Sequence, residues 1–285
     1  MAIDITILQT GTIRIRPSHQ HQSAKRPVPL RIARMFVDRR WTSPLPINTY
    51  LIDHPEGRIL FDTGESPEAV SRRFFPWWQP FFMLSIDIDI ERSESIGALL
   101  ARRGLTSADL RCVVVSHLHH DHGDGLRDLP DTTIYTSPDH WEAFRSPFKA
   151  VMQGGVPSHW PSGFRPTLLE PTGGPIGPFE RSYPLTSDGT ISAVDLPGHL
   201  PGMIGLLIRD GDLTYFLVSD ATYDQGLLDC EVTDGVNTRP HVAIESMRKI
   251  KEFARSTPTV VLPAHDLAAA RRLANREVYL PTPRP

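Results

Sequence analysis

Several features that would narrow the function of a protein are scarce in this chain of 285 residues. There are 2 cysteines, Cys112 and Cys230, too few for a disulfide framework, and neither has a cysteine neighbour at metal-ligand spacing. Cys112 opens an apolar run, which predicts a buried thiol. The chain lacks a run of about 18 apolar residues, which excludes a transmembrane helix. With a formal net charge of -3, it has no bulk attraction for nucleic acid or an anionic membrane, and we expect neither as a partner.

The N-terminus lacks the features of a secretory signal. Residues 1–8 alternate between apolar and polar side chains, which is typical of a β-strand. They have no basic start, no long apolar run and no small-residue cleavage site. We therefore expect a cytoplasmic protein.

Strand signals occur in two groups along the chain, and helix signals lie between them. Strands are predicted at residues 1–8, 48–53, 58–62, 112–115, 133–136, 190–195, 203–208, 213–218 and 259–262. Helices are predicted at residues 93–103 with Ser93 as cap, from Pro138 with Ser137 as cap, at 241–255 and at 267–275. Without a repeat or a clear linker, this order predicts one α/β domain spanning residues 1–285.

Long loops are expected to interrupt this domain near residues 14–46, 72–92 and 149–185. Proline is frequent at 27 residues, which favours loops and short elements. The basic stretch 14–40 is predicted to be a solvated loop, although an anionic substrate remains a minority alternative.

One short run carries the strongest chemical signal. Residues 116–123 read Ser-His-Leu-His-His-Asp-His-Gly and follow an apolar strand directly. In an extended segment, residues two apart point to the same side, so His117 and His119 can bind one ion. Asp121 and His122 fall where the chain turns toward a helix, and face a second ion. Imidazole and carboxylate donors suit zinc, with manganese, iron or cobalt as alternatives.

One run cannot complete the ligand shells of two ions, so further donors must come from elsewhere in the chain. Three candidates follow predicted strands: His199, Asp220 and His265. A lone histidine or aspartate at a strand end is more often a loop or cap residue. Two metal shells require further donors, and three segments that each end a strand in a histidine or an aspartate supply them. The sequence therefore predicts a site for two divalent ions, in the first place Zn²⁺.

The order of these residues resembles that of the metallo-β-lactamase superfamily. The His-x-His-x-Asp-His run, the Gly198-His199 loop, Asp220 and His265 occur in the family's order, and so does Phe-Asp-Thr-Gly at residues 61–64. The likeness spans residues 48–266, most of the chain. It implies an αβ/βα four-layer sandwich, with two mixed β-sheets covered by helices and the metal ions at one edge between the sheets.

The resemblance also implies a role for each donor. One ion would take His117, His119 and His199. The other ion would take Asp121, His122 and His265. Asp220 would bridge the two ions, and Asp62 would support a ligand by a hydrogen bond without binding metal itself.

Within the superfamily, the segment after Asp220 resembles the N-acyl-homoserine lactonases, the quorum-quenching branch. Residues 219–223 read Ser-Asp-Ala-Thr-Tyr, and the corresponding tyrosine of that branch hydrogen-bonds the substrate at the metal site. Tyr223 would do the same here, and the alternative is a packed loop aromatic. One departure is Asp124, where the family more often has glycine. It leaves the ligands alone but alters the helix start or adds a contact behind them.

Residues 74–83, the aromatic arm, form a second unusual feature. The arm contains two prolines, which argue against a regular helix or a central strand. It is either an apolar wall or lid for an acyl chain, or a surface packed on the core or on the second subunit of a homodimer. The wall would consist of Phe74, Phe75, Trp77, Trp78, Phe81, Phe82 and Met83.

Together these features predict a dinuclear-metal hydrolase that opens a lactone ring, in the first place that of N-acyl-homoserine lactones. The substrate is a small lactone or ester with an apolar chain. Water that bridges two ions ionises near neutral pH, and the hydroxide would attack the carbonyl carbon. Tyr223 would polarise the carbonyl oxygen, and Asp121 would pass a proton to the leaving alkoxide.

Other functions on the same fold remain as alternatives. These are a thioesterase of the glyoxalase II kind, a β-lactamase and a phosphodiesterase. Glyoxalase II-like chains usually follow the bridging aspartate with a Thr-Leu-Phe type of sequence, unlike residues 221–223. A non-catalytic metal-binding scaffold would have lost ligands, and none is lost here.

The remaining histidines receive no ligand role. His19 and His21 lie in a polar segment without a carboxylate neighbour and are expected to be solvated. His120 alternates away from His117 and His119, which favours packing or support over ligation. No motif surrounds the histidines at 54, 140, 159 and 241.

Overall fold

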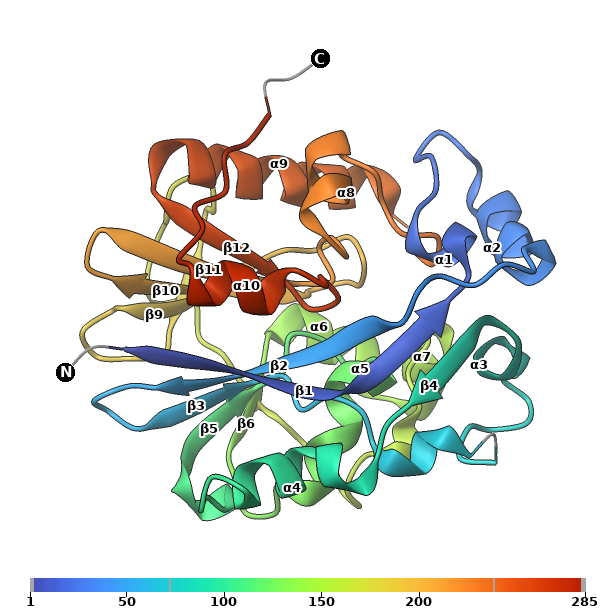
Figure 1. The fold of residues 1–285 in the computed structure, drawn as a ribbon, viewed down its shortest axis with the longest axis horizontal. Helices are drawn as coiled ribbons and strands as arrows, with labels where there is room; N and C mark the ends of the chain where they lie inside the picture. The colour runs from blue at the N-terminus through green and yellow to red at the C-terminus, as the bar shows by residue number, and fades with distance from the viewer. Residues whose placement is uncertain (1–2, 72, 238, 283–285) are drawn as a thin grey trace. The chain divides into compact units, whose positions relative to one another are not determined.

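The fold comes from a computed structural model, which describes residues 3–71, 73–237 and 239–282. Contacts along the chain divide it into two units. Unit 1 consists of Met1–Arg16 and Arg39–Leu168, and unit 2 of Pro17–Asp38 and Leu169–Pro285. Each unit contains one β-sheet with its own helices (Figure 1).

Unit 1 contains a seven-stranded mixed sheet in the order β4-β1-β2-β3-β5-β6-β7. The strands are β1 (Asp4–Ile15), β2 (Leu45–Asp53), β3 (Arg58–Phe61), β4 (Ile86–Asp89), β5 (Leu110–Val114), β6 (Ile134–Thr136) and β7 (Thr167–Leu168). β3, β5, β6 and β7 run parallel to one another. Parallel strands end at the same edge of a sheet, so the segments that follow β3 and β5 meet there.

The helices of unit 1 are short, as the proline content predicts. They are α3 (Pro80–Ser85), α4 (Ile96–Ala101), α5 (His120–Gly123), α6 (Pro138–Phe144) and α7 (Pro147–Met152). Ser137 caps α6 as predicted, by accepting a hydrogen bond from the His140 backbone. The predicted cap of α4 is wrong, because Ser95 and not Ser93 accepts from the helix.

The aromatic arm contains a helix that the sequence analysis did not expect. Pro80 occupies the first position of α3, where a helix needs no backbone N–H donor and the fixed φ of proline suits the helix. Pro80 therefore begins a short helix, and Pro76 lies outside it.

Unit 2 contains a five-stranded mixed sheet in the order β12-β11-β10-β9-β8. The strands are β8 (Ser182–Pro184), β9 (Ile191–Asp195), β10 (Ile204–Asp210), β11 (Leu213–Ser219) and β12 (Thr259–Pro263). β10 is antiparallel to both β9 and β11, and β12 is parallel to β11. It follows that β9, β11 and β12 run in one direction and end at one edge.

The helices of unit 2 are α1 (Pro17–Gln20), α2 (Val28–Val37), α8 (Gln225–Cys230), α9 (Pro240–Ser256) and α10 (Ala269–Ala274). α9 lies along the sheet (Figure 1), and its residues Met247, Ile250 and Phe253 join a core with Val194 of β9 and Phe216 of β11. Burial of such side chains contributes about 1.5–3 kcal/mol each. This core holds the strand ends in place.

The basic stretch 14–40 is not the solvated loop that its composition predicts. It ends β1, then forms α1 and α2, and Arg31 of α2 is fully buried. Among the described residues, no helix combines the length and the apolarity that a membrane span requires.

Candidate metal centre

The strand pairing of unit 1 brings Asp62 to the histidine run. Asp62 follows β3, and the run follows the neighbouring β5. One carboxylate oxygen of Asp62 accepts from the Ser116 backbone N–H at 2.7 Å. The other accepts from the Ser116 hydroxyl and from His122 Nδ1, both at 2.9 Å. The φ of Asp62 is 61°, a left-handed conformation that aspartate tolerates better than most residues.

Hydrogen bonds fix which ring nitrogen each histidine of the run can offer to a metal. His122 uses Nδ1 for Asp62, and the Nδ1 of His117 lies 3.0 Å from the Ser116 hydroxyl. Both rings therefore offer Nε2. His119 is the reverse, because its Nε2 lies 3.1 Å from the Gln153 carbonyl and leaves Nδ1 as the donor. Such backing bonds orient histidine ligands in metal sites.

The donors of unit 1 form one buried group at the start of α5. The ring centroids of His117 and His119 are 4.9 Å apart, and those of His117 and His122 are 4.0 Å apart. Asp121 Oδ1 lies 4.0 Å from His122 Nε2. His117, Asp121 and His122 are buried, whereas His119 is half-buried. The run thus presents adjacent donors, as its spacing predicts.

The second group of donors follows the parallel strands of unit 2. His199 comes after β9, Asp220 after β11 and His265 after β12, so the common strand direction collects them at one edge. Gly198 allows this at His199: its φ is 142°, and a Cβ there would lie 2.3 Å from the Ala243 Cα of α9. Only glycine fits so close to the helix.

The geometry of this second group suits metal ligation, with the Asp220 carboxylate between the two histidines. Asp220 Oδ2 lies 3.6 Å from His199 Nε2, and Asp220 Oδ1 lies 3.3 Å from His265 Nε2. Two ligands of one tetrahedral zinc ion, each at about 2.0–2.1 Å, lie about 3.4 Å apart. Asp220 thus presents one oxygen to each histidine, as a bridging carboxylate would. The residues present fit divalent metal ions.

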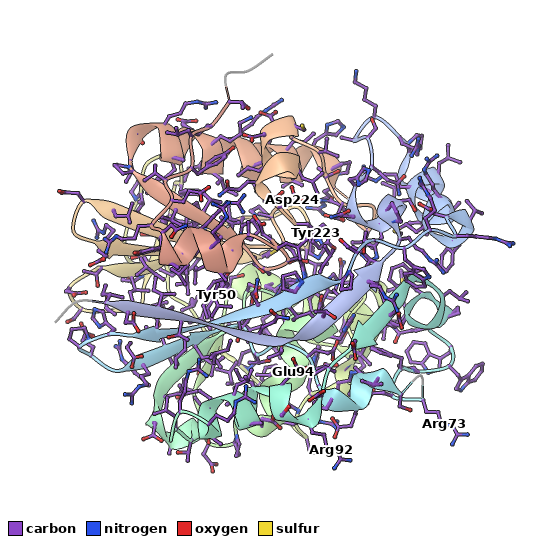
Figure 2. All side chains as sticks on the ribbon, viewed as in Figure 1. Tyr50, Arg73, Arg92, Glu94, Tyr223 and Asp224 are labelled. Carbon is purple, nitrogen blue, oxygen red and sulfur yellow. The ribbon has the colours of Figure 1, made fainter. Side chains whose placement is uncertain are left out.

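Tyr223 lies beside these donors. Figure 2 shows it next to Asp224, which caps α8 by accepting from the Leu227 N–H at 2.8 Å. The Tyr223 ring is 5.1 Å from the ring of His265 and 6.5 Å from that of His199, centroid to centroid. The tyrosine therefore lies between the start of α8 and the donor group of unit 2.

Sequence reasoning missed the carboxylate behind His199. Asp234 Oδ2 lies 3.1 Å from His199 Nδ1, which leaves Nε2 of His199 facing Asp220. Burial alone would raise the pKa of Asp234, but His199 lowers it below its usual value. Asp234 lies far from His199 in the chain and within no motif, so only the fold reveals it.

The segment Pro17–Asp38 holds the loop that carries Asp234. Arg31 donates to Thr233 Oγ1 at 3.1 Å and to the Asp234 carbonyl, and the Gly235 N–H donates to the His19 carbonyl at 2.6 Å. His19 is buried, with its ring centroid 6.4 Å from that of Tyr223. The prediction of a solvated His19 is wrong, because α1 packs against this loop. His21 is exposed as predicted.

A second unpredicted cluster lies behind the histidine run in unit 1. His120 Nδ1 is 2.5 Å from Glu65 Oε2, and His159 Nδ1 is 2.6 Å from Asp124 Oδ2. Burial opposes protonation of His120, yet Glu65 and Asp121 raise its pKa to about 9. Burial also raises the pKa of Asp124 well above its usual value and lowers that of His159 to about 4. The departure at Asp124 thus adds a contact behind the ligands.

One further histidine without a predicted role supports the run. His140 Nε2 accepts a hydrogen bond from the Leu118 backbone N–H at 2.9 Å. It is fully buried in α6, one turn from the Ser137 cap. Its contact fixes the backbone between His117 and His119.

The aromatic arm divides into buried and exposed rings. Phe75 and Phe82 are buried, and Phe74 and Phe81 are half-buried. Trp77 and Trp78 are 84% and 51% exposed. The side chain of Met83 lies outside the described part of the structure.

Comparison with known proteins identifies the family of this site. The sequence profile of the metallo-β-lactamase superfamily matches residues 42–265. The chain belongs to the metallo-β-lactamase superfamily. It carries the family's histidine and aspartate cluster, which makes it a metal-dependent hydrolase of that superfamily.

The curated relatives of this superfamily member include lactonases. The N-acyl homoserine lactonase AttM of Rhizobium radiobacter is 25% identical over 226 residues, covering 78% of this chain and 82% of AttM. The N-acyl homoserine lactonase AiiA of Bacillus thuringiensis subsp. kurstaki is 25% identical over 224 residues, with the same coverage of 78% and 82%.

Solved structures confirm the predicted fold class. An N-acyl homoserine lactone hydrolase with N-hexanoyl-L-homoserine at its catalytic metal centre superposes with a TM-score of 0.73 at 21% identity, covering 98% of both chains. The dizinc lactonase AidC gives a TM-score of 0.63 at 16% identity, covering 93% of this chain and 88% of AidC. The two mixed sheets with their helices thus form the metallo-β-lactamase fold.

Proposed function

We propose that the donors of units 1 and 2 together bind two divalent metal ions, in the first place Zn²⁺, and that the protein opens lactone rings. In this proposal one ion would be held by His117, His119 and His199. The other would be held by Asp121, His122 and His265, and Asp220 would contribute to both. Asp62 and Asp234 hold the rings of His122 and His199 by their Nδ1 atoms.

The observation that supports a lactonase most directly is Tyr223. It lies three residues after Asp220, and its ring packs near those of His265 and His199. A phenol at this point donates a hydrogen bond to a carbonyl oxygen on which negative charge develops. The lactonases AttM and AiiA are among the relatives of the chain, which supports N-acyl-homoserine lactones as substrates.

Two residues of the chain would act on the substrate beside the metal ions, Tyr223 at the carbonyl oxygen and Asp121 at the leaving oxygen. A pair of bound divalent ions supplies a water of lowered pKa and polarises the substrate carbonyl. Tyr223 orients the carbonyl oxygen through its hydroxyl. Asp121, buried beside His122, would accept a proton from the attacking water and pass it to the alkoxide oxygen that leaves as the ring opens.

The aromatic arm supplies the wall for the apolar chain of the substrate in this proposal. Its buried rings Phe75 and Phe82 line a cavity of about 370 Å³ together with Trp41, Ile86, Ile88 and Arg16. The lining also includes the charged side chain of Asp87, so an alkyl chain would lie against the aromatic and aliphatic side chains, and Arg16 and Asp87 would face its polar end. The exposed rings of Trp77 and Trp78 are the surface through which we propose a homodimer, to be tested by analytical ultracentrifugation.

The test is hydrolysis of N-acyl-homoserine lactones from butyryl to dodecanoyl by the metal-loaded protein. We expect ring opening, and a fall of roughly 10²-fold in kcat/KM for Tyr223→Phe with unchanged metal content. A glyoxalase II-type thioester, a β-lactam and a phosphodiester serve as comparison substrates. No ring opening at any chain length, or faster turnover of a comparison substrate, would contradict the lactonase proposal.

Two predictions from the sequence remain predictions. One is the single domain over residues 1–285, which a single cooperative unfolding transition would support. The other is the cytoplasmic location, which cell fractionation would test.

A further inference from the structure

A cluster of four buried polar side chains in unit 1 lies outside the proposed metal ligands. Glu65 follows β3, His120 belongs to α5, Asp124 follows α5, and His159 ends the short helix Pro157–His159. All four are at most 5% exposed. Three separate segments thus bring polar groups into the interior, where each needs a partner.

Two contacts in this cluster have the lengths of hydrogen bonds, although ligand atoms of Glu65, His120 and Asp124 also lie within 4.8 Å of one another, as in a metal site. The nitrogen–oxygen distances of 2.5 Å for His120–Glu65 and 2.6 Å for His159–Asp124 each have room for one proton. Two ligands of one zinc ion would lie about 3.4 Å apart. The hydrogen bonds of the cluster therefore join its segments.

The cluster is connected to the aromatic arm by two routes. His159 Nε2 donates to the Phe74 carbonyl at 2.9 Å, and its ring stacks on Phe74 with the centroids 3.8 Å apart. The His120 ring makes edge contacts with Phe75 at 5.2 Å and with Phe82 at 5.4 Å. Two buried imidazoles, those of His120 and His159, thus link the metal-binding turn to the arm.

These contacts determine one wall of the cavity in unit 1. Phe75 and Phe82 stack on each other at 4.9 Å, with an angle of 18° between their planes. Both rings contact His120, and both line the cavity of about 370 Å³. A displacement of the cluster therefore moves the cavity wall.

We propose that Glu65, His120, Asp124 and His159 are positioning residues that hold the aromatic arm against the metal-binding turn and so determine which acyl chains the enzyme accepts. The proposal rests on the proposed lactonase function for its substrate. It explains why Asp124 stands where the resemblance led us to expect glycine: its side chain reaches His159, which in turn holds Phe74.

The experiment compares variants that break the cluster with one that keeps its hydrogen bonds. His159→Phe keeps a ring against Phe74 but loses both hydrogen bonds, and Asp124→Leu loses the contact with His159. Asp124→Asn keeps a donor for His159 Nδ1. Arg73→Gln is the matched control, because Arg73 directly precedes the arm and its side chain is exposed.

We expect the two breaking variants to change the ratio of kcat/KM for decanoyl and butyryl homoserine lactone by roughly tenfold, through KM. Metal content and kcat for the butyryl substrate stay near wild type. Amide hydrogen exchange of residues 74–85 becomes faster in both. Asp124→Asn and Arg73→Gln keep the wild-type ratio and exchange.

Three outcomes would overturn this proposal. In the first, both breaking variants keep the wild-type amide hydrogen exchange of residues 74–85 and the wild-type chain-length preference. A second is equal loss of activity for all chain lengths together with loss of metal, which would assign the cluster to the metal site. The third is a third equivalent of metal that the breaking variants lose. If wild-type protein opens no lactone, the proposed function is wrong. The positioning role is then tested by hydrogen exchange alone, through the exchange rate of residues 74–85 in the breaking variants.

Discussion

The donor groups of the two units are built in different ways. Unit 1 takes its donors from one run, residues 117–122, at the turn between β5 and α5. Unit 2 takes His199, Asp220 and His265 from three loops, which meet because β9, β11 and β12 run in one direction. The first group depends on local spacing and the second on sheet topology. We therefore expect substitutions in the two groups to affect metal binding and stability to different extents.

The two groups also differ in how their backing carboxylates are held. Asp62 belongs to the same sheet edge as its histidine and accepts three hydrogen bonds from Ser116 and His122. Asp234 lies on a loop outside the sheet. Arg31 and His19, both of the segment Pro17–Asp38, hold this loop by hydrogen bonds to its backbone. The backing in unit 2 therefore depends on a distant part of the chain.

Loss of the central carboxylate is expected to have the largest effect. Asp220→Ala removes the oxygens that face both His199 and His265, and with them several kcal/mol of transition-state stabilisation. We expect kcat/KM to fall on the order of 10³-fold and the metal content to drop below two equivalents. Asp210→Ala is the control, because Asp210 ends β10 in the same sheet and pairs with Arg276. Full metal content in Asp220→Ala would contradict the bridging role.

The hydrogen bonds that hold the Asp234 loop of unit 2 can be removed at Arg31. Arg31→Met leaves the buried Thr233 hydroxyl and the Asp234 carbonyl without their donor, which should lower the free energy of unfolding by about 3 kcal/mol. Urea denaturation measures this loss. Arg34→Met is the control, since Arg34 lies on the same helix with an exposed side chain. Equal stability of the two variants would show that the segment does not hold the Asp234 loop.

The two backing carboxylates allow a direct comparison of the units. Asp62→Asn and Asp234→Asn each weaken a histidine ligand, and metal affinity should fall roughly 10–100-fold. We expect the larger loss for Asp62→Asn, because Asp62 accepts three hydrogen bonds and asparagine would replace one acceptor oxygen. Asparagine tolerates the φ of 61° at this position, so the backbone is unchanged. Competition with a chromogenic chelator measures both affinities, and a larger loss for Asp234→Asn would reverse the comparison.

The smallest effect concerns the two thiols, one in each unit. Cys112 of β5 is buried, and burial raises its pKa to about 11, so it holds no thiolate near neutral pH. Cys230, at the end of α8, is exposed. Reaction with dithionitrobenzoate at pH 8 should titrate one thiol in the folded protein and two in denaturant. Rapid reaction of both thiols in the folded protein would show that β5 opens beside the histidine run.

The sequence predicts the parts of this molecule that depend on local spacing. The histidine run, the strands on either side of it and the Ser137 cap of α6 follow from patterns within a few residues. His199, Asp220 and His265 are predictable as strand-end residues only because two metal shells require further donors. The resemblance to the superfamily then gives their order.

The parts that the sequence does not predict depend on contacts between distant segments. Asp234, Glu65 and His159 belong to no motif, and only folding brings each to its partner. The burial of His19 and Arg31 is missed because their segment is polar in composition, although its polar groups pair with the Val232–Gly235 loop. Composition predicts solvation only where such partners are absent.

Metal content of the purified protein tests the central claim most directly. If the proposed function is right, the protein binds about two divalent ions per chain, measured by inductively coupled plasma mass spectrometry. Removal of the ions with a chelator should abolish hydrolysis, and their return should restore it. A content of zero or one ion per chain, or hydrolysis that survives removal of the metal, would contradict the account.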